Sequence, residues 1–155
     1  MKVLLLVCIS VLGFCKTPAV NYETLAMQVQ KEAAEELAHK YNLHLAGFGG
    51  GMMGQINRMA IMFDYDQKVD IQAGSQMLTN CAKIFLRHVN ESESIRPYLA
   101  KYPADLENIE IIIYPERTSA RDFNDRIIAM SIHKNQIRFL INEKFETIDI
   151  NPTMF

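Results

Sequence analysis

The sequence predicts an α+β fold: an antiparallel sheet of about five strands with two main helices packed on one face. Two stretches with apolar residues at three- and four-residue steps indicate the helices, and shorter stretches with alternating apolar residues indicate the strands. The elements follow one another as helix, strand, strand, helix, short helix and three strands. Because the chain shows no repeat or linker, residues 20–150 are predicted to form one domain, followed by a tail at 151–155.

The composition is that of a folded protein. The chain has 155 residues, of which 49% are hydrophobic and 22% are charged, and these fractions are close to the averages for globular domains. They exclude a chain that is mostly disordered or of low complexity. With 16 Lys and Arg residues against 18 Asp and Glu residues, the formal net charge is −2. Binding to a nucleic-acid backbone needs a strongly basic surface, so we expect no nucleic-acid partner.

Residues 1–15 have the pattern of a secretory signal peptide. Lys2 supplies the positive charge at the start, and a mostly apolar run follows it. The run is too short for a transmembrane helix, since crossing ~30 Å of hydrocarbon takes about 20 residues. We therefore expect an exported protein, secreted or periplasmic, whose mature chain begins between Cys15 and Val20. The alternative is a buried N-terminal strand.

Cys15 leaves a second route of processing open. Residues 12–15 (Leu-Gly-Phe-Cys) have the outline of a lipobox, in which the Cys becomes a lipidated N-terminus, although Phe14 is larger than the residue preferred before that Cys. Ordinary cleavage reads small residues at −3 and −1, which sites between about residues 15 and 19 offer. We expect soluble export, with a lipid anchor on Cys15 as the alternative and no membrane-spanning segment in the body.

Two long helices are predicted over residues 22–41 and 71–89. Asn21 and Asp70 precede them as N-caps, because their side-chain oxygens can accept hydrogen bonds from the first free backbone N–H groups. Asn42 is suited to closing the first helix. The polar side chains of the first helix lie off its apolar stripe: Gln28, Gln30, Lys31, Glu32, Glu35 and Lys40.

Strands complete the predicted fold. Gly54-Gln55 indicates a two-residue hairpin turn between the first two strands, and Lys134-Asn135 indicates a tight turn between the last two. A short helical turn over residues 95–99 follows the second helix, since Pro97 is tolerated only in a first turn. The predicted strands cover residues 43–53, 56–65, 108–114, 126–133 and 137–142.

Cys81 is the one cysteine in the predicted mature body, which therefore forms no internal disulfide. It continues the apolar stripe of the second helix between Leu78 and Phe85. We expect a buried, unreactive thiol rather than a nucleophile or an intermolecular bridge.

Residues 90–103 carry a family resemblance. Ile95-Arg96-Pro97-Tyr98-Leu99 and Tyr102-Pro103 stand ahead of a strand that begins Asn-Ile-Glu-Ile, and a glycine-rich strand and a long helix precede them. Over about residues 40–115 this arrangement resembles a group of exported small α+β proteins of intracellular bacteria. The resemblance implies export and an α+β fold. Because no activity is assigned to that group, the resemblance implies no site residues.

Residues 49–54 (Gly-Gly-Gly-Met-Met-Gly) match the spacing of the dinucleotide-binding glycine fingerprint. That motif needs a helix directly after the glycines, because the pyrophosphate rests on the helix N-terminus. Here a strand is predicted to follow. We therefore expect the glycines to serve sheet curvature or close packing, with the approach of a ligand to bare backbone as an alternative, and we predict no cofactor.

Two groups of side chains could in principle bind a metal ion, but each lacks ligands that such a site needs. Glu36 and His39 form one Glu-x-x-His pair, whereas di-metal bundles need two such pairs and two further Glu. Asp64, Asp66 and Asp70 lack the glycine and the final bidentate Glu of a calcium loop. No motif combines a nucleophile with a base. We predict neither a metal site nor catalytic residues.

Arg96, Tyr98 and Tyr102 are the candidate partner-binding residues. Tyr and Arg dominate the hot spots of protein interfaces, and Pro97 and Pro103 stiffen the backbone beside them. The alternative is a structural plug that closes the end of the second helix over the sheet.

The plug and the partner surface predict different exposure along this segment. Ile95 and Leu99 are four residues apart on a helical turn, so we expect both to face the core. Arg96, Tyr98 and Tyr102 are expected to be at least partly exposed and to tolerate alanine with little loss of stability.

These observations favour an exported, non-catalytic protein that binds a protein or an envelope component. The alternatives are a small envelope hydrolase or a small-ligand-binding module with a site assembled only in the fold. Polar side chains from separate elements that converge in one deep cleft would favour the alternatives.

Overall fold

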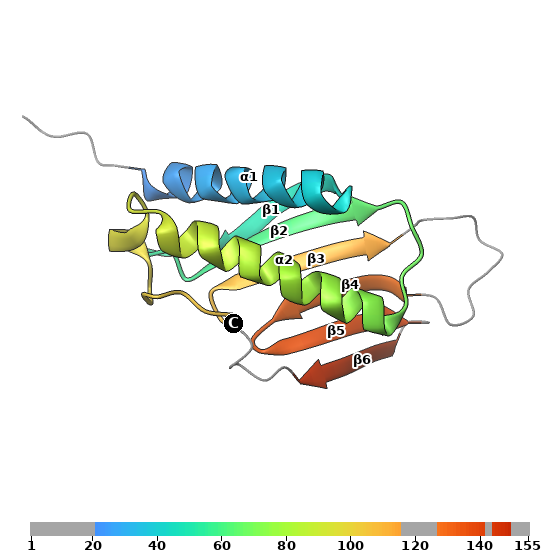
Figure 1. Cartoon of the computed structure of the whole chain (residues 1–155). Helices are drawn as coiled ribbons and strands as arrows, with labels where there is room; N and C mark the ends of the chain where they lie inside the picture. The colour runs from blue at the N-terminus through green and yellow to red at the C-terminus, as the bar shows by residue number, and fades with distance from the viewer. Residues whose placement is uncertain (1–20, 116–126, 142–143, 150–155) are drawn as a thin grey trace, which may run out of the picture.

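The structure, a computed structural model, describes residues 21–115, 127–141 and 144–149. These residues form two layers, a six-stranded sheet and two long helices on one of its faces (Figure 1). The predicted α+β class is confirmed. The elements are α1 (Tyr22–Tyr41), β1 (His44–Gly51), β2 (Arg58–Tyr65), α2 (Ile71–Glu91), a 3₁₀ turn (Arg96–Tyr98), β3 (Ile109–Pro115), β4 (Ile127–His133), β5 (Gln136–Ile141) and β6 (Lys144–Asp149).

Both ends of α1 and the start of α2 are capped as predicted. The side chain of Asn21 accepts hydrogen bonds from the backbone N–H groups of Glu23 and Thr24, at 3.1 and 3.3 Å. Asp70 accepts from the N–H of Ala73 at 2.7 Å at the start of α2. Asn42 ends α1 in the left-handed conformation, with φ 53°. These caps fix where each helix enters and leaves the core.

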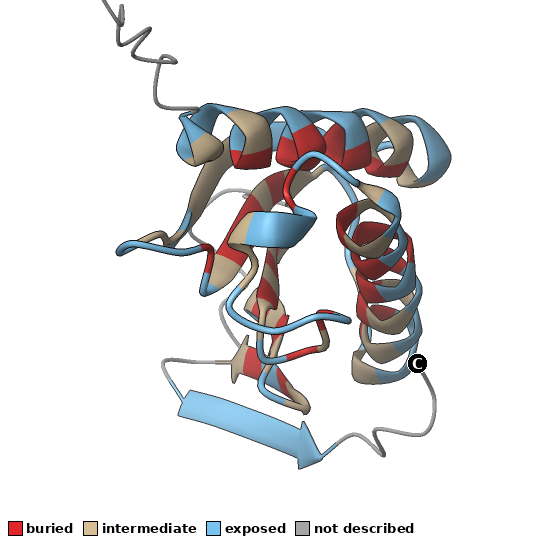
Figure 2. Ribbon diagram, turned by 90° about the vertical axis from the view of Figure 1, so that its left-hand side faces the viewer, coloured by how far each residue is buried: buried red, intermediate tan, exposed pale blue. Residues whose placement is uncertain are grey.

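The core lies between the helices and the inner face of the sheet (Figure 2). α1 packs on β1 and β2, whereas α2 packs on β3, β4 and β5. The predicted stripe of α2 faces the sheet, where Leu78, Cys81, Phe85 and Val89 are fully buried. The strands bury alternate side chains against the helices: Met59, Ile61, Phe63, Ile109, Ile111, Ile113, Met130, Ile132, Ile137 and Phe139.

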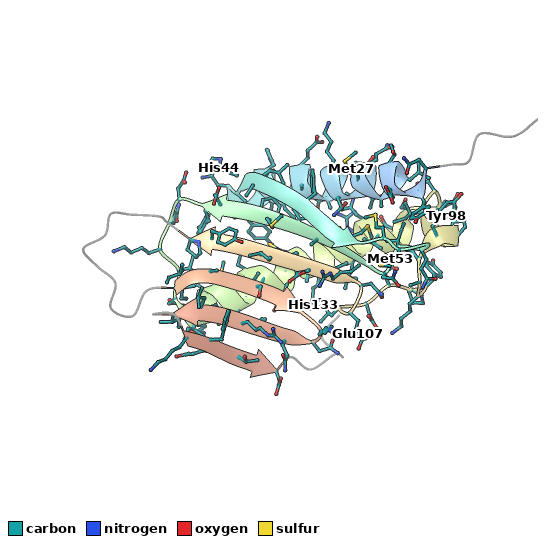
Figure 3. The ribbon with its side chains drawn as sticks, turned by 180° about the vertical axis from the view of Figure 1, so that it is seen from behind. Met27, His44, Met53, Tyr98, Glu107 and His133 are labelled. Atoms are coloured by element: carbon teal, nitrogen blue, oxygen red, sulfur yellow. The ribbon has the colours of Figure 1, made fainter. Side chains whose placement is uncertain are left out.

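The strands lie in sequence order, β1 to β6, and neighbouring strands are antiparallel except for β2 and β3. The prediction of a wholly antiparallel sheet is wrong at this pair. α2 carries the chain back across the face of the sheet, so β3 starts at the same end as β2 and runs parallel to it. The opposite face of the sheet, seen in Figure 3, carries no helix among the described residues.

β6 is a sixth strand, where the sequence predicts about five. It pairs with β5 from Lys144 opposite Ile141 to Asp149 opposite Gln136. All of its residues are exposed, because it extends beyond the helices (Figure 2). A strand that buries neither face leaves no apolar alternation in the sequence, so the pattern did not reveal it. The predicted tail at 151–155 lies outside the described residues.

The two predicted turns have different outcomes. Lys134 and Asn135 both have positive φ, 49° and 59°, as a tight hairpin turn between β4 and β5 requires. The predicted two-residue turn at Gly54-Gln55 is wrong, since β1 ends at Gly51 and β2 begins at Arg58. The longer connection exists because Ile56 within it is buried and paired with the segment that follows α2.

Gln30 departs from its predicted place on the polar side of α1. It is 2% exposed, and its Nε2 donates hydrogen bonds to the carbonyl oxygens of Gly49 and Ala60, both at 2.8 Å. A buried amide with both of its N–H groups bonded costs little and fixes the position of α1 over β1 and β2. Helical spacing alone cannot show that a polar side chain is satisfied by strand carbonyls.

Cys81 is fully buried in α2, as predicted. Burial raises the pKa of its thiol to about 12, so the reactive thiolate is scarce at neutral pH. We expect the native protein to resist alkylation by a bulky maleimide that labels the urea-unfolded chain at once, measured by mass spectrometry. Rapid labelling without denaturant would contradict this. Cys81→Ser should lower the free energy of unfolding by about 1–3 kcal/mol, because the buried hydroxyl lacks a partner.

Candidate protein-binding surface

The segment after α2 is anchored by Ile95, which is fully buried. The next residues form a 3₁₀ turn, in which the N–H of Tyr98 donates to the carbonyl of Ile95 at 2.9 Å and that of Leu99 to the carbonyl of Arg96 at 3.3 Å. Pro97 stands in this first turn, as predicted. The half-buried Leu99 packs against the core. Ile95 and Leu99 therefore both point inward, in agreement with their four-residue spacing.

Backbone hydrogen bonds join this segment to the connection between β1 and β2. The N–H of Ile56 donates to the carbonyl of Tyr98 at 2.7 Å, and the N–H of Ala100 donates to the carbonyl of Ile56 at 3.0 Å. Ile56 itself is 1% exposed. Two loops that are far apart in the sequence thus hold each other in place at one end of the molecule.

Tyr98 also packs on the start of α1. Its ring stacks on that of Tyr22, with 5.6 Å between the ring centroids, and the Tyr22 hydroxyl donates to the carbonyl of Met52 at 3.0 Å. Tyr98 is therefore half-buried and part of the packing that closes this end of the core. Tyr98 therefore supports the alternative in which this segment is a structural plug.

The far side of the segment is fixed to α2. The side-chain amide of Asn90 donates to the carbonyl of Ala104 at 3.0 Å and accepts from the N–H of the same residue at 2.7 Å. Lys101 is paired with Asp105. Although burial raises the pKa of the Asp105 carboxyl, the hydrogen bonds from Lys101 and from the N–H of Glu107 hold it below its ordinary value. The backbone is thus tied down on both sides of Tyr102.

Tyr102 remains exposed on this fixed backbone, with 51% of its surface accessible. The Arg96 guanidinium lies over its ring, 4.8 Å from the centroid. Met53, on the neighbouring connection between β1 and β2, is 91% exposed. Figure 3 places Met53 and Tyr98 at the same end of the molecule. We call the group Met53, Arg96, Tyr98 and Tyr102 the tyrosine platform.

Tyr98 and Tyr102 should respond differently to alanine. Tyr98→Ala removes the stack on Tyr22 and a half-buried ring, so we expect a loss of about 1–3 kcal/mol in the free energy of unfolding. Tyr102→Ala removes an exposed ring and one cation–π contact, which should cost less than about 1 kcal/mol. The expectation that Tyr98 tolerates alanine is revised accordingly. Urea denaturation of both variants measures the difference, and equal losses would show that the whole segment is a plug.

A cavity of about 480 Å³ lies beside α2, where three separate segments meet. Three of its polar side chains bond within the protein: Asn90 to Ala104, Arg87 to Glu36 at 2.6 Å and Asp105 to Lys101. The lining contains Lys83 and Asp105 as titratable side chains besides Arg87, and no Ser, Cys or His. The cavity is lined by Lys83, Leu86, Arg87, Asn90, Pro103, Ala104, Asp105, Leu106 and Asn135. Sequence spacing could not reveal it, because its walls come together only in the fold.

Glu36 of α1 forms ion pairs with two residues of α2. Its partners there are Arg87 and His88, and not the His39 of the Glu-x-x-His pair. Its carboxylate lies 2.8 Å from Nε2 of His88 and 2.6 Å from the Arg87 guanidinium. The hydrogen bonds from His88 and Arg87 lower the pKa of Glu36 below its ordinary value. Among the described residues no three His, Cys, Asp or Glu side chains are placed to hold a metal ion.

The other singled-out residues serve the fold or lie outside the described part. The glycines of residues 49–54 lead into the strand β2 rather than into a helix, so they lack the context of a dinucleotide fingerprint. Asp66 pairs with His44 at 2.8 Å, and Asp70 caps α2. Cys15 lies outside the described residues.

Neither protein-family profiles, nor curated proteins, nor solved structures match this chain. The resemblance of residues 40–115 to exported proteins of intracellular bacteria therefore stays a prediction. The functional proposal therefore rests on the geometry of the described residues.

Proposed function

We propose that the mature domain is a non-catalytic protein that binds another protein through the tyrosine platform. The observation that carries this proposal is an exposed aromatic side chain, Tyr102, on a backbone fixed from both sides. Large exposed rings on rigid backbone bind partners at low entropic cost, because little conformational freedom is left to lose. A ring needed only for folding would instead point into the core.

The chemistry of the platform indicates what the partner presents. Tyr102 and Met53 offer apolar surface, and Arg96 lies over the ring as a cation. Arg beside Tyr is the composition of interface hot spots, in which the ring contributes contact area and the guanidinium binds a carboxylate. The partner fitted to this surface carries an apolar side chain next to an acidic one.

A photo-crosslinking experiment tests this proposal. Benzoylphenylalanine placed at position 102 should crosslink one defined protein from the exported or envelope fraction of the source cells. The matched control is position 145 on β6, where Phe145 is 71% exposed at the opposite edge of the sheet. Arg96→Ala should weaken the crosslink from position 102. Identical sets of crosslinked proteins from both positions would overturn the proposal.

Export is the second part of the proposal, with soluble release favoured and a lipid anchor on Cys15 as the alternative. It is supported by Lys2 and the apolar run that follows it. None of the helices in the described ranges is long and apolar enough to span a bilayer. The localisation proposed is secreted, periplasmic or lipid-anchored.

The mass of the exported protein checks this proposal. We expect a chain that begins between Cys15 and Val20, since cleavage after the apolar run removes the signal peptide. Intact-mass spectrometry measures the start directly, and the added mass of acyl chains on Cys15 would select the lipid-anchored form. Exported material that begins at Met1 would contradict the prediction.

A further inference from the structure

Among the described residues, β1 is an edge of the sheet, with a neighbouring strand only on the side of β2. In an antiparallel ladder alternate residues direct their N–H and C=O groups away from the partner strand, so one row of these groups on β1 faces none of the described strands. Four of the eight residues of β1 are glycine, including Gly49 and Gly50. Because glycine carries no side chain, another strand can approach this backbone closely, and of these groups the Gly49 carbonyl already accepts a hydrogen bond from Gln30.

A groove runs beside this edge, with α1 as its other wall. Glu23, Met27 and Gln30 line it from α1, where their spacing of four and three residues places them on one side of the helix. Phe48 and Met52 line it from β1 and its continuation, together with Gly49 and Gly50. The groove has a volume of about 320 Å³. Met27 is 52% exposed at this wall (Figure 3).

We propose that the partner contributes an extended segment, which adds to β1 as a further strand and lies in the groove between β1 and α1. This inference rests on the proposed function. Backbone groups of the segment hydrogen-bond to the edge of β1, and an apolar side chain contacts Met27, Phe48 and Met52. Glu23 is the charged residue of the groove, so the segment carries a basic side chain at that end.

The contrast between the two edges of the sheet supports β1 as the receiving strand. Proteins protect sheet edges with charged residues and prolines. β6 follows this rule, since three of its six residues are charged: Lys144, Glu146 and Asp149. β1 has neither lysine nor proline; its first residue, His44, pairs with Asp66, and a bulge lies between Leu45 and Gly47. Phe48, Gly49 and Gly50 of this edge strand line the groove.

The groove is continuous with the tyrosine platform. Met52, at the end of the groove, accepts a hydrogen bond from Tyr22, and Tyr22 stacks on Tyr98. A segment that pairs with β1 and continues past Met52 therefore reaches Met53 and Tyr98 without crossing the core. One partner can occupy both surfaces.

Selection from a displayed library of random peptides tests the inference. The peptides span β1, about ten residues, and the target is the mature chain. Enriched peptides should bind the native protein but bind Met27→Glu at least roughly tenfold more weakly, because that variant places a charge in the apolar contact. Phe145→Glu is the matched control, since it introduces the same charge at an exposed apolar residue of the opposite edge and should leave affinity unchanged.

N-methylation of the selected peptide separates strand addition from binding by side chains alone. Methylation at one alternate set of amides should abolish binding, whereas methylation at the other set should not, because only every second N–H faces β1. Amide hydrogen exchange in β1 should slow on binding, with β6 unaffected. Equal tolerance of both methylated sets, or no enriched peptide, would overturn strand addition. Defined crosslinks from position 102 would then still uphold the platform, so the two proposals fail independently.

Discussion

Ile95→Ala is expected to lower the free energy of unfolding by about 2–5 kcal/mol, the range for truncating a fully buried aliphatic side chain. Ile95 has no exposed surface, and it is the anchor from which the 3₁₀ turn starts. Tyr98 donates a hydrogen bond to the carbonyl of Ile95 and accepts one from the N–H of Ile56, so the contact between Tyr98 and Ile56 should loosen as well. Urea denaturation of the variant and of the native chain measures the loss.

Arg96→Ala is the matched control for Ile95→Ala, since its side chain is exposed on the adjacent residue. It should change the free energy of unfolding by less than about 1 kcal/mol. If Ile95→Ala were as mild as Arg96→Ala, the segment would not be anchored in the core. The anchoring of the segment in the core would then no longer support a rigid tyrosine platform.

Gly50→Ala is the second substitution with a large expected effect, about 1–3 kcal/mol or more. A Cβ at this position would lie 2.4 Å from the carbonyl oxygen of Arg58, and the residue has φ +157°. The contact is with backbone, so relief requires β1 and β2 to move apart. The thermal midpoint and the free energy of unfolding in urea should both fall.

Gly51→Ala provides the control for Gly50→Ala within the same strand. A Cβ at position 51 has no atom within 4 Å, so alanine should be tolerated with a change of about 0.5 kcal/mol or less. A similar decrease in the free energy of unfolding for both variants would contradict this prediction. It would mean that replacing any glycine of β1 is destabilising, whether or not the new Cβ meets another atom.

The helices and most strands could be predicted because burial leaves a period in the sequence. Leu78, Cys81 and Phe85 repeat at helical spacing, and Ile109, Ile111 and Ile113 mark one face of β3 in the same way. β6 left no such period, since both of its faces are exposed. The parallel direction of β3 could not be predicted from periodicity, because alternation is the same in either direction.

Arg96, Tyr98 and Tyr102 of the candidate site could be predicted from the sequence, whereas Met53 and the contacts of the site could not. The residue types and the neighbouring prolines predicted Arg96, Tyr98 and Tyr102 as partner-binding residues. In the structure the side chains of Tyr102 and Arg96 are exposed. The stack of Tyr98 on Tyr22 joins residues far apart in the chain, which local spacing cannot show. The groove beside β1 was missed for the same reason, since Met27 and Phe48 meet only in the fold.

The parallel pairing of β2 with β3 has a consequence for how the chain folds. The other strand pairs are antiparallel, with no helix between their strands among the described residues, whereas Met59 meets Ile109 only after α2 has crossed the sheet. Conformational entropy is lost when the ends of that long loop are brought together, before any contact between β2 and β3 stabilises the pair. Non-local pairing of this kind slows folding. The hairpin of β1 and β2 and the meander from β3 to β6 can therefore each begin to form alone. α2 packs on β3, β4 and β5 and also contacts α1, so its docking joins the two parts into one core.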